Sequence, residues 1–154
     1  MTIKQSDILF KTTVPLWIAM GKAGKKFILN LNNYRNLHYR SLNNAKQNYS
    51  ALVENKLPSR FKIPHDQPIM AIYVYYAQTK RKIDVANPCS IIDKFTCDAI
   101  VKKGLLIDDN IDYLKEVRYV YGGVDRGNPR CDLYLVKHHP DCYGELFQYA
   151  ETSD

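Results

Sequence analysis

The apolar positions along the chain form several short runs typical of strands and two longer stretches typical of helices. Residues 69–77 are almost continuously apolar or aromatic, which is the length and composition of a strand at the centre of a sheet. Residues 8–20 and 26–31 predict two more strands, joined by a Gly- and Lys-rich turn over residues 21–25. Residues 105–107 predict another strand, and residues 117–121 and 133–136 predict a late hairpin around a turn at 122–129.

The clearest helix is predicted over residues 88–103. Asn87 is a good N-cap, Pro88 suits the first helical position, and Gly104 suits the residue just past the end. At about 100° per residue, one arc of this helix is apolar and should face the core. It comprises Pro88, Ile91, Ile92, Phe95 and Ala99.

Two other segments have weaker patterns. The Asn-rich residues 30–48 predict a loop that runs into a helix ending near residue 56, and residues 142–150 predict a short closing helix. Strands before, between and after two helices predict an α+β fold, with a mixed β-sheet and two main helices on one face. No repeat or low-complexity linker divides the 154 residues, so we expect a single domain.

Charge is distributed unevenly. Residues 1–83 hold 14 basic and 3 acidic side chains, a net charge of +11, whereas residues 84–154 hold 8 basic and 13 acidic ones, a net charge of −5. A basic half attracts a polyanion, and an acidic cluster in the same protein suggests a metal ion held against that polyanion. The alternative is a surface of mixed charge that only maintains solubility.

Cysteine usage and hydropathy bear on the compartment. The four cysteines form no C-x-x-C pair, which favours reduced thiols in a cytosolic protein. A zinc site from Cys131, His138, His139 and Cys142 is an alternative, but their spacing matches no common zinc motif. The uncharged residues 12–21 contain Pro15 and suit neither a signal peptide nor a membrane span. We therefore expect a cytoplasmic protein without a membrane partner.

Four aspartates are candidate metal ligands. Asp84 follows the strand predicted at residues 69–77, and Asp108 and Asp109 follow the strand predicted at 105–107. The intervening helix would carry the chain back, so that the two strand ends adjoin. Asp98 lies on that helix. Hard divalent cations such as Mg²⁺ bind carboxylate oxygens, and in a nuclease the cation polarises the phosphate and activates water.

Polar residues also line the predicted helix. Asn87, Lys94 and Asp98 fall within about 40° of one another beside the apolar arc. The basic triplet at residues 80–82 directly precedes Asp84, as suits a phosphate chain held beside carboxylates. Simpler interpretations are that Lys94 and Asp98 form a surface pair, that residues 108–110 form a turn, and that Asp84 caps the helix.

In order and spacing, residues 80–110 resemble the RusA family of Holliday-junction resolvases. The shared features are basic residues, then Asp84, Asn87, Lys94 and Asp98, then a hydrophobic stretch that ends in Asp108 and Asp109. Residues 30–49 resemble the family more weakly. The resemblance implies a RusA-like fold and a small, homodimeric, Mg²⁺-dependent endodeoxyribonuclease of phages and prophages, with Mn²⁺ as an alternative cofactor.

The chain departs from the family pattern at two places. Lys94 lies seven residues after Asn87 rather than three, but four extra residues are just over one helical turn and return Lys94 to nearly the same face. Ala86 occupies the place of an aspartate that the family uses as a metal ligand. Three alternatives follow: Asp93, Asp98 or Asp108 substitutes for it, the site binds metal more weakly, or the protein binds junctions without cutting them.

The leading hypothesis is a homodimer that resolves four-way or related branched DNA by paired nicks in a bacterial or phage-infected cell. A twofold dimer suits a symmetric junction. By the resemblance, Asp84 and Asp109 hold the metal, with Asp108 and Asp98 as further ligands, and Lys94 orients water or stabilises charge on the phosphate. The predicted DNA contacts are Lys22, Lys25, Lys26, Arg35, Arg40, Lys80, Arg81, Lys82 and Asn87.

Two rival hypotheses remain. The loss of one ligand at Ala86 permits a non-catalytic protein that binds branched DNA or RNA, marked by salt-dependent binding without nicking. The 12 tyrosines permit a nuclease for single strands or RNA, with aromatic rings as stacking platforms.

Overall fold

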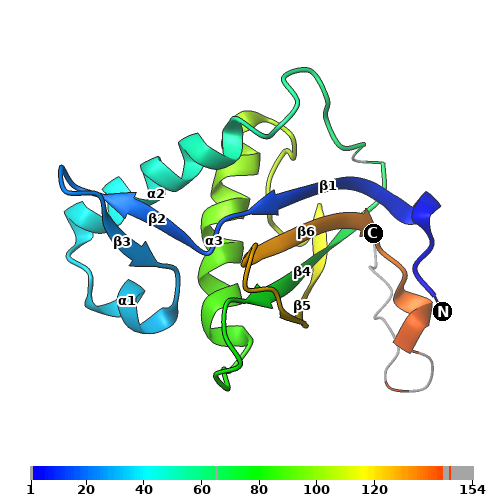
Figure 1. Ribbon diagram of the computed structural model, residues 1–154. Helices are drawn as coiled ribbons and strands as arrows, with labels where there is room; N and C mark the ends of the chain where they lie inside the picture. Colours follow the sequence, from blue (N-terminus) through cyan, green and yellow to red (C-terminus); the bar gives the residue numbers. More distant parts are fainter. Residues whose placement is uncertain (1, 65, 144–145, 147–154) are drawn as a thin grey trace.

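A computed structural model describes residues 2–64, 66–143 and 146, and shows a sheet covered on one face by helices (Figure 1). Four strands form the main sheet in the order β1-β6-β4-β5, and β2 and β3 form a separate hairpin. The strands are β1 (Ile8–Val14), β2 (Trp17–Met20), β3 (Lys25–Ile28), β4 (Ile69–Ala77), β5 (Leu114–Val124) and β6 (Arg130–Lys137). The helices are α1 (Leu31–Asn36), α2 (Tyr39–Glu54) and α3 (Ala86–Lys103), with short 3₁₀ turns at Gln5–Asp7 and Pro140–Tyr143.

The central strand is β4, at the residues predicted for it. It pairs with β6 in antiparallel orientation and with β5 in parallel orientation, so the sheet is mixed. The predicted late hairpin is wrong because β4 lies between β5 and β6, although both strands exist. The strand predicted at 105–107 is also wrong, since no strand begins between α3 and Leu114. The α+β class with a mixed sheet and two main helices is confirmed.

Helix α3 packs between α2 and the sheet, as its sequence predicts. It begins at Ala86, two residues earlier than expected, so the prediction of Asn87 as the N-cap is wrong: Asn87 lies in the first turn, and its Oδ1 accepts from the Leu31 amide instead. All five residues of the predicted apolar arc are buried. Gly104 adopts φ of +79°, a left-handed conformation that glycine accepts readily, and ends the helix as predicted. The buried hydroxyls of Tyr49 on α2 and Thr96 on α3 lie 2.8 Å apart in a hydrogen bond that joins the two helices.

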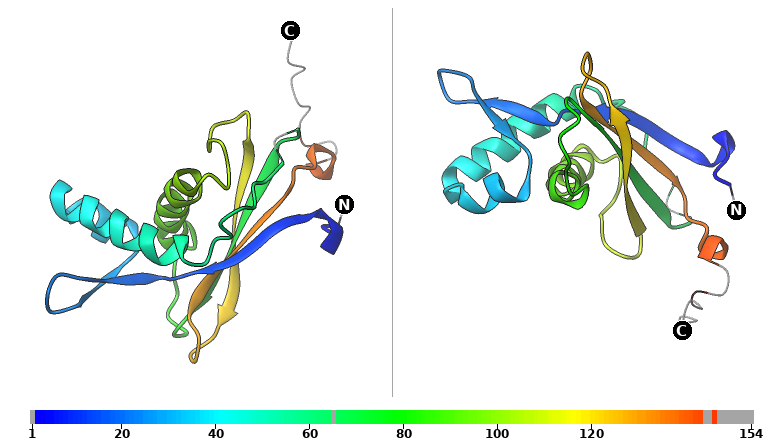
Figure 2. Two further views of the ribbon diagram at one scale, coloured as in Figure 1. Left: turned by 90° about the horizontal axis from the view of Figure 1, so that it is seen from above. Right: turned by 60° about the horizontal axis from the view of Figure 1, so that its bottom comes forward.

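The N-terminal part differs from its prediction in two respects. Pro15 interrupts the strand predicted over residues 8–20, so β1 joins the main sheet while β2 pairs with β3. The stretch predicted as an Asn-rich loop contains α1 and the first half of α2, with the Asn30 side chain accepting a hydrogen bond from the Asn33 amide to cap α1. The hairpin, α1 and the start of α2 form a lobe beside the sheet, which we call the basic lobe (Figure 2).

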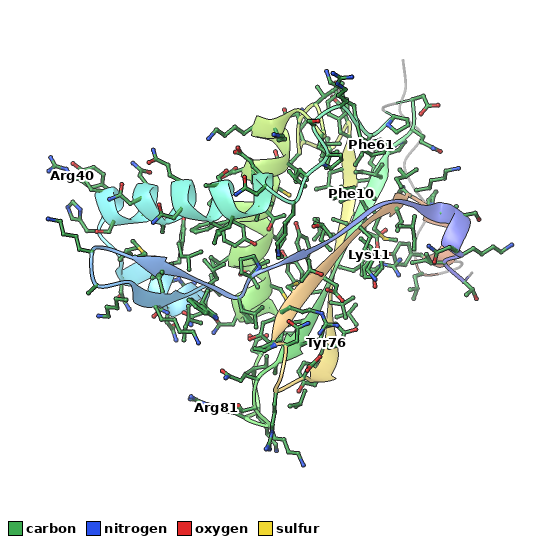
Figure 3. The ribbon with its side chains drawn as sticks, turned by 45° about the horizontal axis from the view of Figure 1, so that its top comes forward. Phe10, Lys11, Arg40, Phe61, Tyr76 and Arg81 are labelled. Atoms are coloured by element: carbon green, nitrogen blue, oxygen red, sulfur yellow. The ribbon has the colours of Figure 1, made fainter. Side chains whose placement is uncertain are left out.

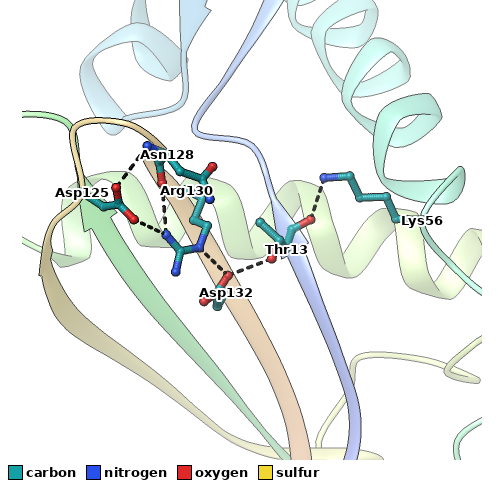
Figure 4. Close-up of polar contacts among 6 residues, drawn as sticks. All are labelled: Thr13, Lys56, Asp125, Asn128, Arg130 and Asp132. Carbon is teal, nitrogen blue, oxygen red and sulfur yellow. Dashed lines mark hydrogen bonds and ion pairs between the residues drawn. The ribbon is translucent and has the colours of Figure 1, made fainter.

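The sheet face opposite the helices carries a polar network between strands. Asp132 Oδ1 accepts hydrogen bonds from Thr13 Oγ1 at 2.8 Å and from Arg130 Nε at 3.1 Å, and Arg130 also pairs with Asp125 (Figure 4). At the outer edge of β1, Lys56 Nζ donates to the Thr13 carbonyl at 3.1 Å. These contacts hold β1 against β6 and partly cover the free edge of β1.

The closing helix predicted at residues 142–150 falls almost entirely outside the described residues. Three of the four cysteines, Cys89, Cys97 and Cys131, are buried and free, as the prediction of reduced thiols requires.

Candidate metal and nucleic-acid site

Asp84 lies at the N-terminal end of α3, in the loop that leaves β4. The side chain is exposed, and its Oδ1 accepts a hydrogen bond of 3.1 Å from the Ala86 amide at the start of the helix. Asp84 directly precedes the N-cap residue Val85, as the simpler interpretation predicted, and its bond to the first helical amide uses one of its two oxygens.

A pocket of about 460 Å³ opens beside Asp84. Its walls come from two regions distant in sequence, the β3–α1 turn and the β4–α3 loop with the start of α3. The polar and charged lining residues are Asn30, Asn32, Gln78, Thr79, Arg81, Lys82, Asp84 and Asn87. An anionic group in this pocket would meet two cations and several hydrogen-bonding side chains, with one exposed carboxylate among them.

Asn87 ties the two walls of the pocket together. Its Oδ1 accepts a hydrogen bond of 2.9 Å from the Leu31 amide, the first residue of α1. This bond holds the basic lobe against the start of α3. Asn87, predicted to contact DNA, therefore has a structural role. Its side-chain oxygen is used in this bond, and its side-chain nitrogen can still donate a hydrogen bond to a ligand. The β3–α1 residues Asn30 and Asn32 were missing from the predicted site; the Asn-rich composition was the only sequence signal for them.

A second pocket, of about 420 Å³, lies on the other side of the basic triplet. It is lined by Lys80, Arg81, Lys82, Ile83, Val85 and Tyr121. Because Tyr121 belongs to the second half of β5, this pocket shows that the β4–α3 loop lies beside the C-terminal end of β5.

Asp98, Asp108 and Asp109 gather near the other end of α3. Asp108 accepts hydrogen bonds of 2.8 Å from the Asp109 amide and from the Asn110 side chain, so residues 108–110 form a turn as the simpler interpretation predicted. Partial burial raises the pKa of Asp109, and the neighbouring carboxylates of Asp108 and Asp98 raise it further. Asp98 also pairs with Lys46 of α2, with Nζ to Oδ2 at 3.6 Å.

The predicted convergence of Asp84 with Asp108 and Asp109 is wrong within one protomer. An α-helix rises about 1.5 Å per residue, so the 18 residues of α3 separate its ends by about 27 Å. The reason is topological: β5 runs parallel to β4, so residues that follow β4 and residues that precede β5 lie at opposite ends of the sheet. In Figure 1, the N-terminal end of α3 lies at the bottom of the view and its C-terminal end lies at the top.

Asp93 does not replace the aspartate that is missing at position 86. Its Oδ2 accepts from the Tyr119 hydroxyl at 2.8 Å, and its Oδ1 accepts from the Cys97 thiol at 3.2 Å. Burial and the Asp93 carboxylate raise the pKa of both donors, which keeps them protonated and hydrogen-bonded. Asp93 therefore connects α3 to β5 from the interior.

Lys94 is exposed on α3, two turns beyond Asn87 and one turn before Asp98. The predicted stripe is confirmed in part: Lys94 and Asp98 share an exposed face, while Asn87 is half-buried. The simpler interpretation predicted an ion pair between Lys94 and Asp98. In the structure Asp98 instead pairs with Lys46, which joins α3 to α2.

The basic lobe is positively charged over its whole length. Residues 8–53 contain no Asp or Glu but seven Lys or Arg residues. The predicted contacts at the hairpin tip and on α1 and α2 are all exposed: Lys22, Lys25, Lys26, Arg35 and Arg40. Lys26 Nζ lies 4.7 Å from the centre of the Trp17 ring, which is 42% exposed. Figure 3 shows Arg40 and Arg81 extending outward from the lobe and from the β4–α3 loop.

The alternative zinc site is dispersed. His138 Nε2 lies 3.2 Å from Glu116 Oε2, and His139 Nε2 lies 3.4 Å from Asp7 Oδ1. Cys131 is a buried residue of β6, and the Cys142 side chain is not among those described. Among the described residues, no group of three or more His, Cys, Asp or Glu side chains is placed to hold a metal ion. No helix in these ranges is long and apolar enough to span a membrane.

No family model matches the chain, and a search of curated proteins finds no significant match. The resemblance to the RusA family therefore stays a prediction that rests on residues 80–110.

Proposed function

We propose that the protein is a structure-selective endonuclease that acts as a homodimer on four-way or related branched DNA. The observation that carries the proposal is the pocket at the N-terminal end of α3. There an exposed carboxylate, Asp84, stands beside Arg81 and Lys82 at the junction with a lobe that lacks acidic residues. Cations around a single carboxylate suit a nucleic-acid phosphate brought to a reacting centre.

The basic lobe and the triplet supply the binding energy. Each Lys or Arg that neutralises a phosphate releases counterions, so affinity should fall steeply with salt. The exposed Trp17 and Tyr39 rings, 42% and 61% exposed, give the lobe surfaces on which unpaired bases at a branch point can stack. Lys94, exposed on α3, is a candidate to stabilise charge on the scissile phosphate.

The proposal includes Mg²⁺ as the cofactor, and the carboxylates of one protomer do not fit it. Mg²⁺ requires several oxygen ligands in nearly octahedral geometry. Asp84 is the one acidic residue among the described residues that line its pocket, and Asp98, Asp108 and Asp109 lie toward the other end of α3. Ala86 supplies no ligand. A nuclease built from this fold must therefore complete its metal site with residues from elsewhere.

The direct test uses a labelled four-way junction and a linear duplex of the same sequence, each with Mg²⁺ or with EDTA, analysed on native and denaturing gels. We expect symmetric nicks in the junction only, and only with Mg²⁺. Cutting of the linear duplex at an equal rate would contradict structure selectivity. A protein that neither shifts nor cuts the junction would overturn the proposal.

The second candidate is a branched-DNA or RNA binding protein without nuclease activity. The separation of Asp84 from the other aspartates and the alanine at position 86 both favour it. In the same gels, this protein would shift the junction in a salt-dependent manner and leave both strands intact with Mg²⁺.

A further inference from the structure

The pocket beside Asp84 has an apolar wall in addition to its charged residues. The buried and half-buried residues of this wall are Leu29, Tyr75, Ala77 and Pro88. The pocket volume of about 460 Å³ lies within the range of about 300–1,000 Å³ that is typical of sites for small organic ligands. A bare phosphate gains nothing from an apolar wall, so this wall indicates a ligand that also has an apolar surface.

Amide side chains form a second part of the pocket lining. They are Asn30, Asn32, Gln78 and Asn87. Asn30 caps α1 and Asn87 bonds to the Leu31 amide, each through its side-chain oxygen, so each side-chain nitrogen can still donate. In the part of the chain that the structure describes, the side chains of Asn32 and Gln78 make no hydrogen bond. An amide presents a donor and an acceptor side by side, which is the complement of the edge of a nucleobase.

Positive charge is the third component. Arg81 and Lys82 line the same pocket from the β4–α3 loop, and guanidinium and ammonium groups bind phosphate oxygens. The pocket thus combines an apolar surface, amide groups and cations. A nucleotide requires the same combination, because its base has apolar faces and a hydrogen-bonding edge and its phosphate is an anion.

The pocket on the other side of the basic triplet provides a comparison within the same molecule. It is lined by all three cations of the triplet, together with Ile83, Val85 and Tyr121, and its described lining contains no Asn or Gln. Cations alone are sufficient for contact with a phosphate backbone. The amides are therefore a distinguishing feature of the pocket beside Asp84, and they indicate that this pocket recognises more than a phosphate.

Hydrogen bonds hold the walls of the pocket in place. The bond of 2.9 Å from the Leu31 amide to Asn87 Oδ1 joins the β3–α1 turn to α3, and the Asn33 side-chain nitrogen donates to the Ile28 carbonyl at 2.8 Å. The Leu29 amide donates to the Leu16 carbonyl at 3.0 Å, which fixes the end of the hairpin. A ligand that enters between such walls loses less free energy to ordering the protein.

We propose that this pocket binds one unpaired nucleotide of the DNA, with its base against the apolar wall and the amides, and its phosphate beside Arg81 and Lys82. The inference rests on the proposed function for its ligand, and it narrows the substrate to branched DNA that presents an unpaired nucleotide. A base inside a duplex is stacked on both faces and its edge is paired, so only an unpaired or extruded nucleotide can enter a pocket.

The inference is tested by fluorescence anisotropy in EDTA, which excludes Mg²⁺-dependent cleavage. The two probes are a labelled duplex with a single-adenosine bulge and the same duplex with an abasic residue at the bulge, which keeps the phosphate and removes the base. Adenine is chosen because Asn and Gln side chains match its edge. We expect the adenosine bulge to bind about 10-fold more tightly than the abasic bulge. Equal affinities, or no affinity for either probe, would overturn the inference.

Variants then locate the base on the protein. Asn32→Ala/Gln78→Ala should reduce the ratio of the two affinities to below about 2-fold. The matched control is Asn43→Ala/Gln47→Ala, which removes the same side-chain types from exposed positions on α2 and should keep the full ratio. Gln78→Ala alone, just after β4, is a second variant should the double variant melt abnormally. A full ratio in the folded pocket variants would place the base elsewhere, as on the exposed Trp17 or Tyr39 ring, and would overturn the assignment.

The outcome distinguishes this inference from the proposed nuclease. Mg²⁺-dependent nicking of the four-way junction without any preference for the adenosine bulge would overturn the nucleotide pocket and leave the nuclease standing. A preference that the pocket variants abolish, in a protein that never nicks, would support the pocket and contradict the nuclease.

Discussion

The two ends of α3 hold carboxylates in opposite physical circumstances. At the N-terminal end, Asp84 accepts a hydrogen bond from the helix, and the positive end of the helix dipole favours its charge. Near the C-terminal end, partial burial raises the pKa of Asp109, and the neighbouring carboxylates of Asp108 and Asp98 raise it further. The first arrangement stabilises the fold and the second opposes it, which makes the second the stronger indication of a function that compensates for it.

The charged residues around the two ends of α3 also differ. Asp84 lies in a pocket with Arg81 and Lys82, next to the basic lobe. At the other end, Asp98 has the ion pair with Lys46, and Lys102 pairs with Glu54 at 3.5 Å. The proposed function therefore expects a nucleic-acid phosphate at the Asp84 end, where cations line the pocket.

The largest effect should come from removing either carboxylate. Asp84→Asn and Asp109→Asn should each lower Mg²⁺-dependent junction nicking by more than about 100-fold, because the proposed function assigns both carboxylates to the metal ion. Junction affinity measured by gel shift should change by less than about 3-fold, since phosphate contacts come from cations. Asp112→Asn, an exposed aspartate of the same loop as Asp109, is the matched control and should nick normally. Normal nicking by Asp84→Asn would refute the assignment.

The next largest effect should be on DNA binding, and it should be confined to the basic lobe, with no change at the C-terminal end of α3. Lys25→Gln/Lys26→Gln at the hairpin tip should weaken junction binding about 10-fold and reduce the slope of log affinity against log salt by about 2. Lys102→Gln/Lys103→Gln removes the same charge at the C-terminal end of α3 and should leave the slope unchanged. Equal slopes for the two double variants would show that the basic lobe is not the DNA-binding surface. The measurement is fluorescence anisotropy of a labelled junction across a salt series.

A third effect tests the packing beside the basic end of β5. A Cβ on Gly122 would lie 2.7 Å from the Tyr76 ring and 2.8 Å from Val74 Cγ1, so Gly122→Ala should destabilise the protein by about 1–3 kcal/mol. Gly127→Ala, whose Cβ would meet nothing closer than 4.0 Å, is the control and should be nearly neutral. Urea unfolding followed by circular dichroism measures both. Equal stabilities would mean that β5 does not approach β4 as closely as described.

The smallest effects should be changes in the free energy of unfolding, with opposite signs for substitutions at the two ends of α3. Asp84→Ala removes a capping bond and should lower the free energy of unfolding at pH 7 by about 0.5–1 kcal/mol. Asp109→Asn removes a repelled charge and should raise it, by well under about 1 kcal/mol because Asp109 is mostly exposed to solvent screening.

The pH dependence distinguishes these two effects. Because the pKa of Asp109 is raised in the folded protein, its ionisation destabilises the fold as pH rises through the region above the ordinary value of 3.8. The gain from Asp109→Asn should therefore be full at pH 7 and vanish near pH 3, where the unmodified side chain is protonated in both states. A gain that persists at pH 3 would point to a cause other than charge. Thermal melts at the two pH values suffice.

Local sequence patterns predicted much of the fold. The apolar run of β4, the apolar arc of α3 and the glycine that ends this helix were sufficient, because each element satisfies its own hydrogen bonds or buries a continuous face. The N-cap predicted at Asn87 was wrong, since the helix already begins at Ala86. Two segments were predicted wrongly. Residues 8–20 were predicted to form one strand, but Pro15 separates two strands within this apolar run. The Asn-rich stretch was predicted to form a loop, because asparagines that cap helices or lie on them are also common in loops.

For the candidate site, too, the sequence predicted some features correctly and could not predict others. Residue types and spacing singled out Asp84, Lys94, Asp98, Asp108 and Asp109 as candidates, and the helical period correctly placed Lys94 and Asp98 on one exposed face. Their convergence could not be predicted from spacing, because it depended on whether residues 105–107 form a strand and on the direction of the strand that follows.

Composition, charge and the period of apolar residues thus determined that this chain forms an α+β domain with a basic N-terminal half and an acidic C-terminal half. These properties depend on neighbours within a few turns or on simple sums. Strand order depends on contacts between residues far apart in sequence, and here β4 took the place between β5 and β6. That placement made β5 parallel to β4, separated the aspartates along the length of α3, and left β5 as the exposed edge.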